Sequence, residues 1–161
     1  TISQGGGFGS YVTVPGTGII LGHGMCRLDP RPGGVNSVAS GKRPLNNTAP
    51  LVLRLPDRDV AIGLPGGRRL VSVNAGMAQR LVDFGSGSHE VCTAPRMHVQ
   101  THEPVMLTET AGEPVIEGLR EMGHEIDVVK GVAGAAHCAE FLKDEGKVRA
   151  GGNGWAAGVD E

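Results

Sequence analysis

Ala61-Ile62-Gly63-Leu64-Pro65-Gly66-Gly67-Arg68-Arg69 joins a predicted strand to a predicted helix. The apolar residues 60–64 predict a buried strand, and a Pro-Gly-Gly turn follows it. After the turn, apolar residues recur at steps of three and four, which predicts a helix that begins at about Arg68 and ends near Gly85. Gly66 and Gly67 are therefore expected where a strand ends and a helix begins.

The glycine pair admits two interpretations. The first N–H groups of a helix have no partner inside the helix, and the helix dipole makes this end positive. Two residues without side chains would let an anion, or the oxyanion that develops during acyl transfer, approach these N–H groups. A tight turn also needs glycine for its backbone angles, with no ligand involved. The motif alone leaves both interpretations open.

Composition predicts a single globular domain over residues 1–161. Hydrophobic residues make up 39% of the chain, which suffices for a core, and 27 glycines with 10 prolines predict many turns. A net charge of −2 gives no argument for binding to nucleic acid or to an anionic membrane, and with only 3% aromatic residues the chain lacks stacking platforms for single-stranded nucleic acid. No apolar run in the sequence is long enough to span a bilayer.

Metal-ligand and triad motifs are missing from the sequence. The three cysteines show no C-x-x-C spacing, and each is expected to be a free, buried small residue. The six histidines form no H-E-x-x-H motif, and no G-x-S-x-G motif is present. We therefore expect neither a metal site nor a cofactor.

A predicted hairpin relates the glycine pair to a second polar motif. Residues 51–55 and 60–64 predict two antiparallel strands around the turn 56–59. Asn46 and Asn47 precede the first strand, and the glycine pair follows the second, so both motifs are expected at the same edge of the sheet. Asparagine amides can donate hydrogen bonds to a carboxylate, although adjacent asparagines can also simply hold a turn. The sequence thus predicts a carboxylate-binding site beside an oxyanion site.

The remaining elements predict an α+β layered domain. Helices are expected over residues 88–93, capped by Ser88, and over residues 113–122. The segment 135–142 suits either a strand or a helix, and 25–41 predicts a long surface loop. Further strands are expected at 11–14, 18–21, 96–100, 105–109 and 126–129, and a turn at 151–154.

An ordered set of short motifs runs along the chain. In order, they are Phe8-Gly9-Ser10, Pro15-Gly16-Thr17-Gly18-Ile19-Ile20-Leu21, Met25, Pro32-Gly33, Lys42-Arg43-Pro44-Leu45, Pro50, Pro65-Gly66-Gly67 and Ala94-Pro95-Arg96. In order and spacing they resemble the small subunit of the gamma-glutamyltransferase family. The resemblance implies an N-terminal-nucleophile hydrolase fold, an αββα sandwich, and a precursor that cuts itself. A threonine freed by that cut would attack a γ-glutamyl amide, as in glutathione, with its own α-amine as the base.

The resemblance also implies roles for individual residues. Gly66 and Gly67 match the oxyanion-hole glycines, and Ser3 stands where a threonine usually supports the nucleophile. Asn46 and Asn47 stand where the family often has a serine pair that holds the substrate α-carboxylate. Gly24 and Arg27 are counted with the substrate-binding residues.

Arg27 departs from the family pattern. It falls where an aspartate usually grips the substrate α-amino group, and an arginine repels an ammonium group that an aspartate attracts. An acidic or N-acylated donor would suit Arg27 better than a free γ-glutamyl group.

Thr1 is expected on the family's second strand, upstream of which the nucleophile would lie. On this interpretation the chain is a truncated small subunit, inactive alone, which exposes an apolar face where the large subunit of the same precursor would pack. The family implies a periplasmic or extracellular location, while the sequence leaves the cytoplasm open. Two alternatives remain: a related amidase that acts on acylated antibiotics or amino-acid polymers, and a non-catalytic binding homologue.

Overall fold

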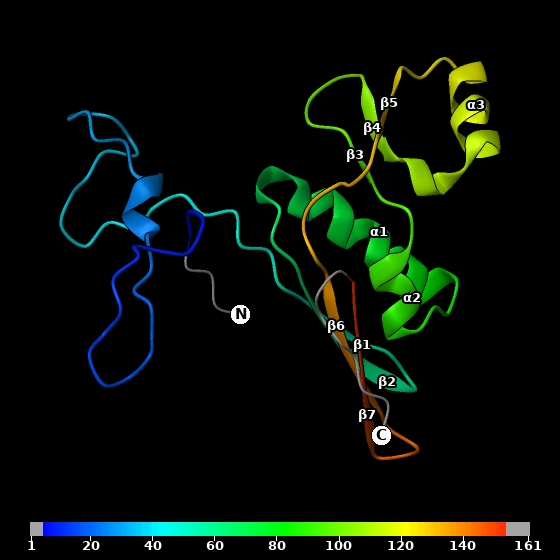
Figure 1. Ribbon diagram of the computed structural model, residues 1–161, viewed down its shortest axis with the longest axis horizontal. Coiled ribbons are helices and arrows are strands. Elements are labelled where there is room, and N and C mark those ends of the chain that lie inside the picture. Colours follow the sequence, from blue (N-terminus) through cyan, green and yellow to red (C-terminus); the bar gives the residue numbers. More distant parts are fainter. Residues whose placement is uncertain (1–4, 154–161) are drawn as a thin grey trace. The chain divides into compact units, whose positions relative to one another are not determined.

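The computed structural model describes residues 5–153 of the chain. By its contacts the chain divides into two compact units, Thr1–Thr48 and Ala49–Glu161, which we call the first and second units. The helices and strands of both are drawn in Figure 1.

The first unit is built mainly from turns. Its one helical element between residues 5 and 48 is the 3-10 helix η1, Gly24–Arg27. The strands expected at 11–14 and 18–21 are wrong, because only an isolated bridge joins Thr13 to Ile20. Gly16 and Gly18 have φ angles of 76° and 69°, which interrupt the extended backbone that a strand needs. The predicted irregular loop after residue 25 is confirmed apart from η1.

The second unit contains a four-stranded antiparallel sheet of order β1-β2-β6-β7. Its strands are β1 Leu51–Arg54, β2 Arg58–Gly63, β6 His137–Leu142 and β7 Lys147–Gly152. The predicted hairpin is confirmed, with Leu51 opposite Ile62. The beginning of β1 and the end of β2 therefore lie at the same edge of the sheet. The segment 135–142, which suited either element, forms a strand.

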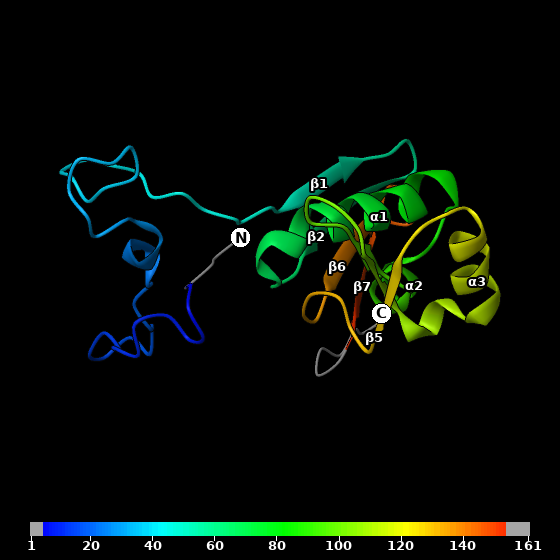
Figure 2. The ribbon, with the colours of Figure 1, turned by 90° about the horizontal axis from the view of Figure 1, so that it is seen from above.

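Two helices cover one face of this sheet, α1 Leu70–Asp83 and α2 Ser88–Thr93 (Figures 1 and 2). The helical periodicity predicted α1, and its apolar side chains form the core with those of β2 and β6; the buried residues are Val60, Ile62, Val73, Met77, Leu81, Val91, Cys92, Val132, Ala136 and Cys138. On the other face of the sheet, Val52 (67%), Phe141 (43%) and Val148 (57%) are exposed. One face of the sheet thus packs against the two helices, and the other leaves apolar side chains exposed to solvent.

A second, three-stranded sheet has the order β3-β4-β5. Its elements are β3 Met97–His98, β4 Val105–Thr108 and β5 Ile126–Val129, with α3 Glu113–Glu121 between the last two. Two further 3-10 turns are η2, Gly67–Arg69, and η3, Glu109–Ala111. β4 and β5 run parallel, as a helical crossover requires. These elements confirm the predicted alternation of strands and helices.

A buried ion pair joins the sheet to both covering helices. Arg58 donates from Nη1 to Glu140 Oε2 at 3.2 Å, and from Nη2 to the carbonyls of Leu81 and Ser86. The other carboxylate oxygen of Glu140 accepts from the N–H of Ser88 at 3.1 Å. The prediction that Ser88 caps α2 is therefore wrong: the helix begins at Ser88, and a carboxylate from β6 takes the place of a local cap.

The turn expected at residues 151–154 is also wrong for its first two residues, because Gly151 and Gly152 belong to β7. A Cβ atom at Gly151 would collide with the backbone of Ser88 and His89. Glycine at this position lets the first turn of α2 lie directly on the strand.

Two of the three cysteines follow the expectation. Cys92 and Cys138 are buried in the core, whereas Cys26 is exposed, so the prediction of a buried Cys26 is wrong. Burial, followed by the nearby Cys92 and Glu140, raises the pKa of the Cys138 thiol to about 12. Cys138 is therefore a core residue rather than a nucleophile.

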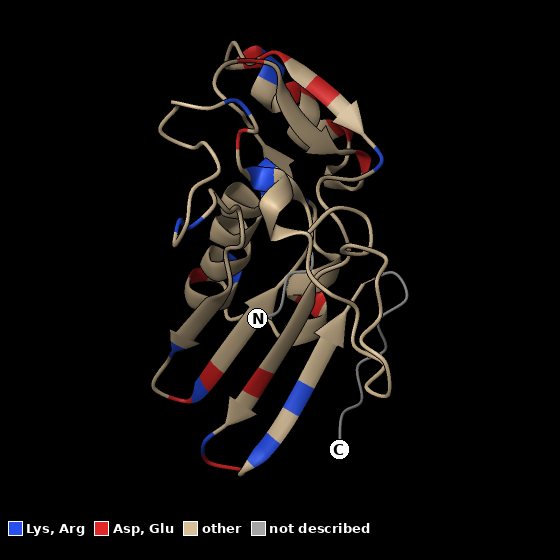
Figure 3. Cartoon of the chain, turned by 90° about the vertical axis from the view of Figure 1, so that its left-hand side faces the viewer, with Lys and Arg blue, Asp and Glu red and all other residues tan. Residues whose placement is uncertain are grey.

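Several charged residues lie at the hairpin end of the four-stranded sheet, where β1 joins β2 and β6 joins β7 (Figure 3). The glycine turn follows β2 at the opposite end of the sheet. Between residues 5 and 153, no helix is long and apolar enough to span a bilayer.

Candidate active site

The turn between β2 and α1 leaves two N–H groups open. Gly66 precedes the 3-10 turn η2, and its carbonyl accepts from the N–H of Arg69 at 3.3 Å. Within the described residues 5–153, the N–H groups of Gly66 and Gly67 donate no hydrogen bond. Gly67 has a φ of 63°, in the region that favours glycine. The turn therefore presents two free donors at the beginning of a helix.

The charge around this turn is positive. Arg68 and Arg69 are exposed and form no ion pair with any residue in the described part of the chain. Cations at a helix N-terminus oppose the helix dipole, so this pair costs α1 stability while it favours an anionic ligand. Free N–H groups, the dipole and two guanidinium groups together suit a negative charge.

A loop far away in sequence fixes the position of Gly66. A Cβ atom built on Gly66 would lie 2.5 Å from the Cβ of Ala133, so only glycine fits against this loop. Pro65 accepts a hydrogen bond from the N–H of Gly134 at 2.8 Å. The role of the loop 132–136 was not predicted from the sequence, where its only signal is a run of small residues between two strands.

Gly24 and Arg27 lie together in η1, in the first unit. Both are exposed, and the carbonyl of Arg27 accepts from Asn36 Nδ2 at 2.6 Å. The Arg27 guanidinium forms no ion pair among residues 5–153. The structure thus brings these two candidates together and leaves the Arg27 charge available.

Asn46 and Asn47 belong to the irregular end of the first unit. Asn46 Oδ1 accepts from both the N–H and the hydroxyl of Thr48, at 3.1 and 2.7 Å. This side chain therefore holds a turn with its oxygen, which leaves its NH₂ group as the available donor. That the Asn pair lies beside Gly66 and Gly67 stays a prediction, as does the supporting role of Ser3, which lies outside the described residues.

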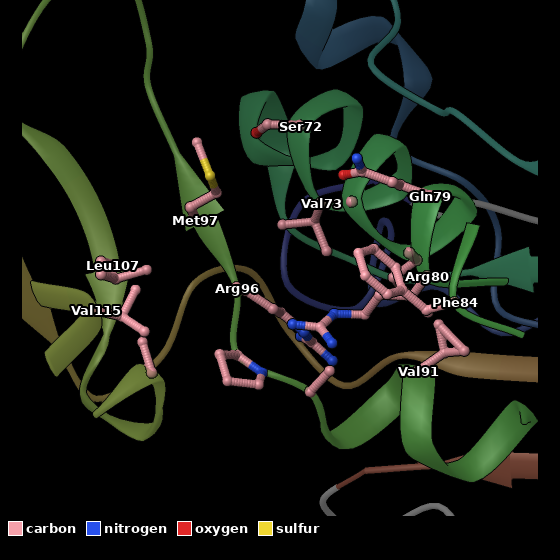
Figure 4. A pocket seen from close by; sticks show the side chains of 15 residues that line it. Ser72, Val73, Gln79, Arg80, Phe84, Val91, Arg96, Met97, Leu107 and Val115 are labelled. Atoms are coloured by element: carbon pink, nitrogen blue, oxygen red, sulfur yellow. The ribbon is translucent and has the colours of Figure 1, made fainter. Parts of the chain in front are cut away.

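A separate cavity of about 480 Å³ lies along α1, beside β3 (Figure 4). Its lining is mostly apolar and includes Met77, Val91 and Leu107, with Arg96 at one side. Nearby, Ser72 Oγ lies 2.7 Å from His98 Nδ1. None of the site residues that the sequence predicts lines this cavity. Among residues 5–153, no group of three His, Cys, Asp or Glu side chains could hold a metal ion.

Comparison with known proteins places these features in a family context. A model of the gamma-glutamyltranspeptidase family matches residues 1–160. The acylase ACY 1 proenzyme of Pseudomonas sp. (strain SE83) is 35% identical over 139 residues, which cover 85% of this chain and 25% of the acylase. The glutathione hydrolase proenzyme of Bacillus subtilis subsp. natto is 30% identical over 118 residues, which cover 73% of this chain and 20% of that protein.

A solved structure shows the same fold. A mutant of Helicobacter pylori gamma-glutamyltranspeptidase superposes with a TM-score of 0.71 at 23% identity, and covers 100% of this chain and 90% of that one. This likeness confirms the predicted α+β fold class of N-terminal-nucleophile hydrolases. The chain spans a quarter or less of the length of the two curated relatives named above.

Proposed function

The chain belongs to the gamma-glutamyltranspeptidase family, and from this premise we propose that it supplies the oxyanion-binding and donor-binding parts of an amidase that cleaves γ-glutamyl amides. The observation that carries the proposal is the pair of free N–H groups at Gly66 and Gly67. They lie in a positively charged turn that a separate loop holds in place. Such donors stabilise the oxyanion of a tetrahedral intermediate.

In the proposed reaction, the hydroxyl of an N-terminal threonine upstream of residue 1 attacks the amide carbonyl. Its α-amine takes the hydroxyl proton, the new C–O bond forms, and negative charge moves onto the carbonyl oxygen beside Gly66 and Gly67. The intermediate then collapses, the C–N bond breaks, and the leaving amine takes the proton. Water or an amine acceptor releases the acyl group in the second half of the reaction.

The exposed apolar face of the four-stranded sheet is an argument that another segment of the same precursor packs against it. Val52, Phe141 and Val148 lie on this face, opposite the helices. In an αββα sandwich a second sheet packs against such a face. We propose that the large subunit supplies that sheet, since the chain spans a quarter or less of the length of the acylase and of the glutathione hydrolase named above.

A second candidate function is an amidase for donors without a free α-amino group. Arg27 favours it, because its unpaired guanidinium would repel the ammonium of a γ-glutamyl donor. The relative with 35% identity is named an acylase, which supports the same candidate.

Paired donors that differ only in the α-amino group separate the two candidates. We expect the processed enzyme from the complete gene to hydrolyse glutaryl-p-nitroanilide faster than γ-glutamyl-p-nitroanilide. Arg27→Asp should shift this preference toward the γ-glutamyl donor by about tenfold or more, because roughly 1.4 kcal/mol of changed charge interaction gives tenfold. The measurement is kcat/KM for both donors in each variant.

The neutral variant Arg27→Gln is the matched control, and its preference should lie between the other two. Strong wild-type hydrolysis of the γ-glutamyl donor that Arg27→Asp abolishes would overturn the role given to Arg27. Hydrolysis of neither donor by a correctly processed enzyme would contradict both candidate functions.

A further inference from the structure

The loop 132–136 contacts the glycine turn at two points. The N–H of Gly134 donates to the carbonyl of Pro65 at 2.8 Å. A Cβ atom built on Gly134 would lie 2.6 Å from Pro65 Cγ, and one built on Gly66 would lie 2.5 Å from Ala133 Cβ. The loop and the turn therefore approach each other as closely as glycine, with no side chain, permits. A shift of the loop toward the turn must move the turn, because there is no free space at the contact, and a shift away from it stretches the hydrogen bond from Gly134 to Pro65.

Arg96 holds this loop from its other side. Its Nη1 donates to the carbonyls of Gly134, at 2.8 Å, and Val132, at 3.4 Å, while Nη2 donates to the carbonyl of Cys92 at 2.6 Å. The residue is only 9% exposed, and no carboxylate among residues 5–153 pairs with it. Burial lowers the pKa of this guanidinium from its ordinary value. Burying a cation that donates only to backbone carbonyls costs free energy of folding. The carbonyls of Val132 and Gly134, which Arg96 holds, both belong to the loop.

Arg96 and the far end of the loop are themselves fixed. The backbone N–H of Arg96 donates to Thr108 Oγ1 at 2.9 Å, and its carbonyl accepts from the N–H of Thr108 at 3.0 Å. At the end of the loop, the N–H of Ala136 donates to Asn153 Oδ1 at 2.6 Å. Arg96, just before β3, therefore holds the loop at Val132 and Gly134, and Asn153, just after β7, holds it at Ala136. Between these points the loop contacts Pro65 and Gly66.

We propose that Arg96 is a positioning residue for the oxyanion site: through the carbonyls of Val132 and Gly134 it holds the loop that fixes the Pro65–Gly66–Gly67 turn. The inference rests on the proposed function for its effect on catalysis. Its structural step, from Arg96 to the turn, stands on the contacts alone. The N–H donors of an oxyanion hole act on an oxygen that becomes charged only in the transition state, so a relaxation of the turn lowers transition-state stabilisation more than it lowers the affinity for substrate.

Two variants of the processed enzyme act at different points of this connection. Gly134→Ala drives a methyl group against Pro65, and Arg96→Lys keeps the charge but replaces a planar fork by a single ammonium group. Gly131→Ala is the matched control, because a Cβ atom at Gly131 meets nothing within 4 Å and its φ is not positive. Should the arginine variant fail to fold, Gly134→Ala still tests the connection.

Hydrogen–deuterium exchange measures the local stability of the turn, and it needs no substrate. The N–H groups of Arg69 and Leu70 bond to the carbonyls of Gly66 and Gly67, so their exchange reports on the turn. We expect faster exchange of these amides in Gly134→Ala and Arg96→Lys. Exchange of Gly146, whose N–H bonds at 2.9 Å in the distant β6–β7 hairpin, should not change. Unchanged exchange at Arg69 and Leu70 in both variants would overturn the inference, whatever the activity.

Kinetics read the catalytic consequence. With the better p-nitroanilide donor, kcat/KM should fall by about ten- to a hundredfold in both variants, while the inhibition constant of the product acid changes by less than about twofold. Gly131→Ala should match the wild type. Faster exchange at Arg69 and Leu70 together with a full kcat/KM would contradict the oxyanion role of the glycines. This outcome would mean that the proposed function fails while the structural connection holds.

Discussion

Gly66→Ala should lower kcat/KM of the processed enzyme by about a hundred- to a thousandfold, the usual cost of losing one oxyanion donor. The new methyl group would have to lie 2.5 Å from Ala133 Cβ, so either the turn or the loop 132–136 must move. Movement of the turn redirects the N–H groups of Gly66 and Gly67, which act on the transition state rather than on the bound substrate. The measurement is steady-state hydrolysis of the p-nitroanilide donors described above.

Gly63→Ala provides the control for this experiment. Gly63 ends β2 three residues earlier, and a Cβ atom there meets nothing within 4 Å. Its kcat/KM should stay within about twofold of the wild type. Equal losses in the two variants, or full activity in Gly66→Ala, would show that the turn is not the oxyanion site.

The second large effect concerns stability. Arg58→Met should lower the free energy of unfolding by about 3–5 kcal/mol, because it leaves a buried carboxylate without its partner. The side chain of Glu140 is only 1% exposed and that of Arg58 is 12% exposed, so solvent cannot replace the lost interaction. The double variant Arg58→Met/Glu140→Met should recover part of the loss. Recovery is incomplete because the N–H of Ser88 and the carbonyls of Leu81 and Ser86 also lose a partner.

Urea denaturation of the purified protein measures both changes. Arg149→Met is the control, since Arg149 lies 3.8 Å from Glu145 in an exposed pair and should cost no more than about 1 kcal/mol. A loss in Arg58→Met as small as that of the control would contradict the structural role of the buried pair. So would a double variant less stable than Arg58→Met alone.

Local sequence patterns predicted much of this fold. The spacing of apolar residues found α1, the turn residues found the β1–β2 hairpin, and Pro114 with Gly123 bounded α3. Each of these signals acts between residues close in sequence, where periodicity and turn preference decide the outcome. The glycine pair at the beginning of α1 was predicted for the same reason.

Three of the errors and omissions have a different cause, which is contact between residues far apart in sequence. Gly151 resembles a turn residue, but it is a strand residue because α2 lies against it. Ser88 resembles a helix cap, but the carboxylate of Glu140, from a distant strand, accepts the hydrogen bond at the beginning of α2. Arg96 was visible only as part of a motif, since its hydrogen bonds reach across 36 and 38 residues to Val132 and Gly134. No local pattern contains such contacts.

The most direct test of the account is the mass and N-terminal sequence of the protein purified after expression of the complete gene. We expect two fragments, of which the smaller contains residues 1–161 and begins with a threonine upstream of Thr1. A polypeptide that stays uncut, or a smaller fragment that begins at Thr1 or with another residue type, would contradict an autoprocessed threonine amidase.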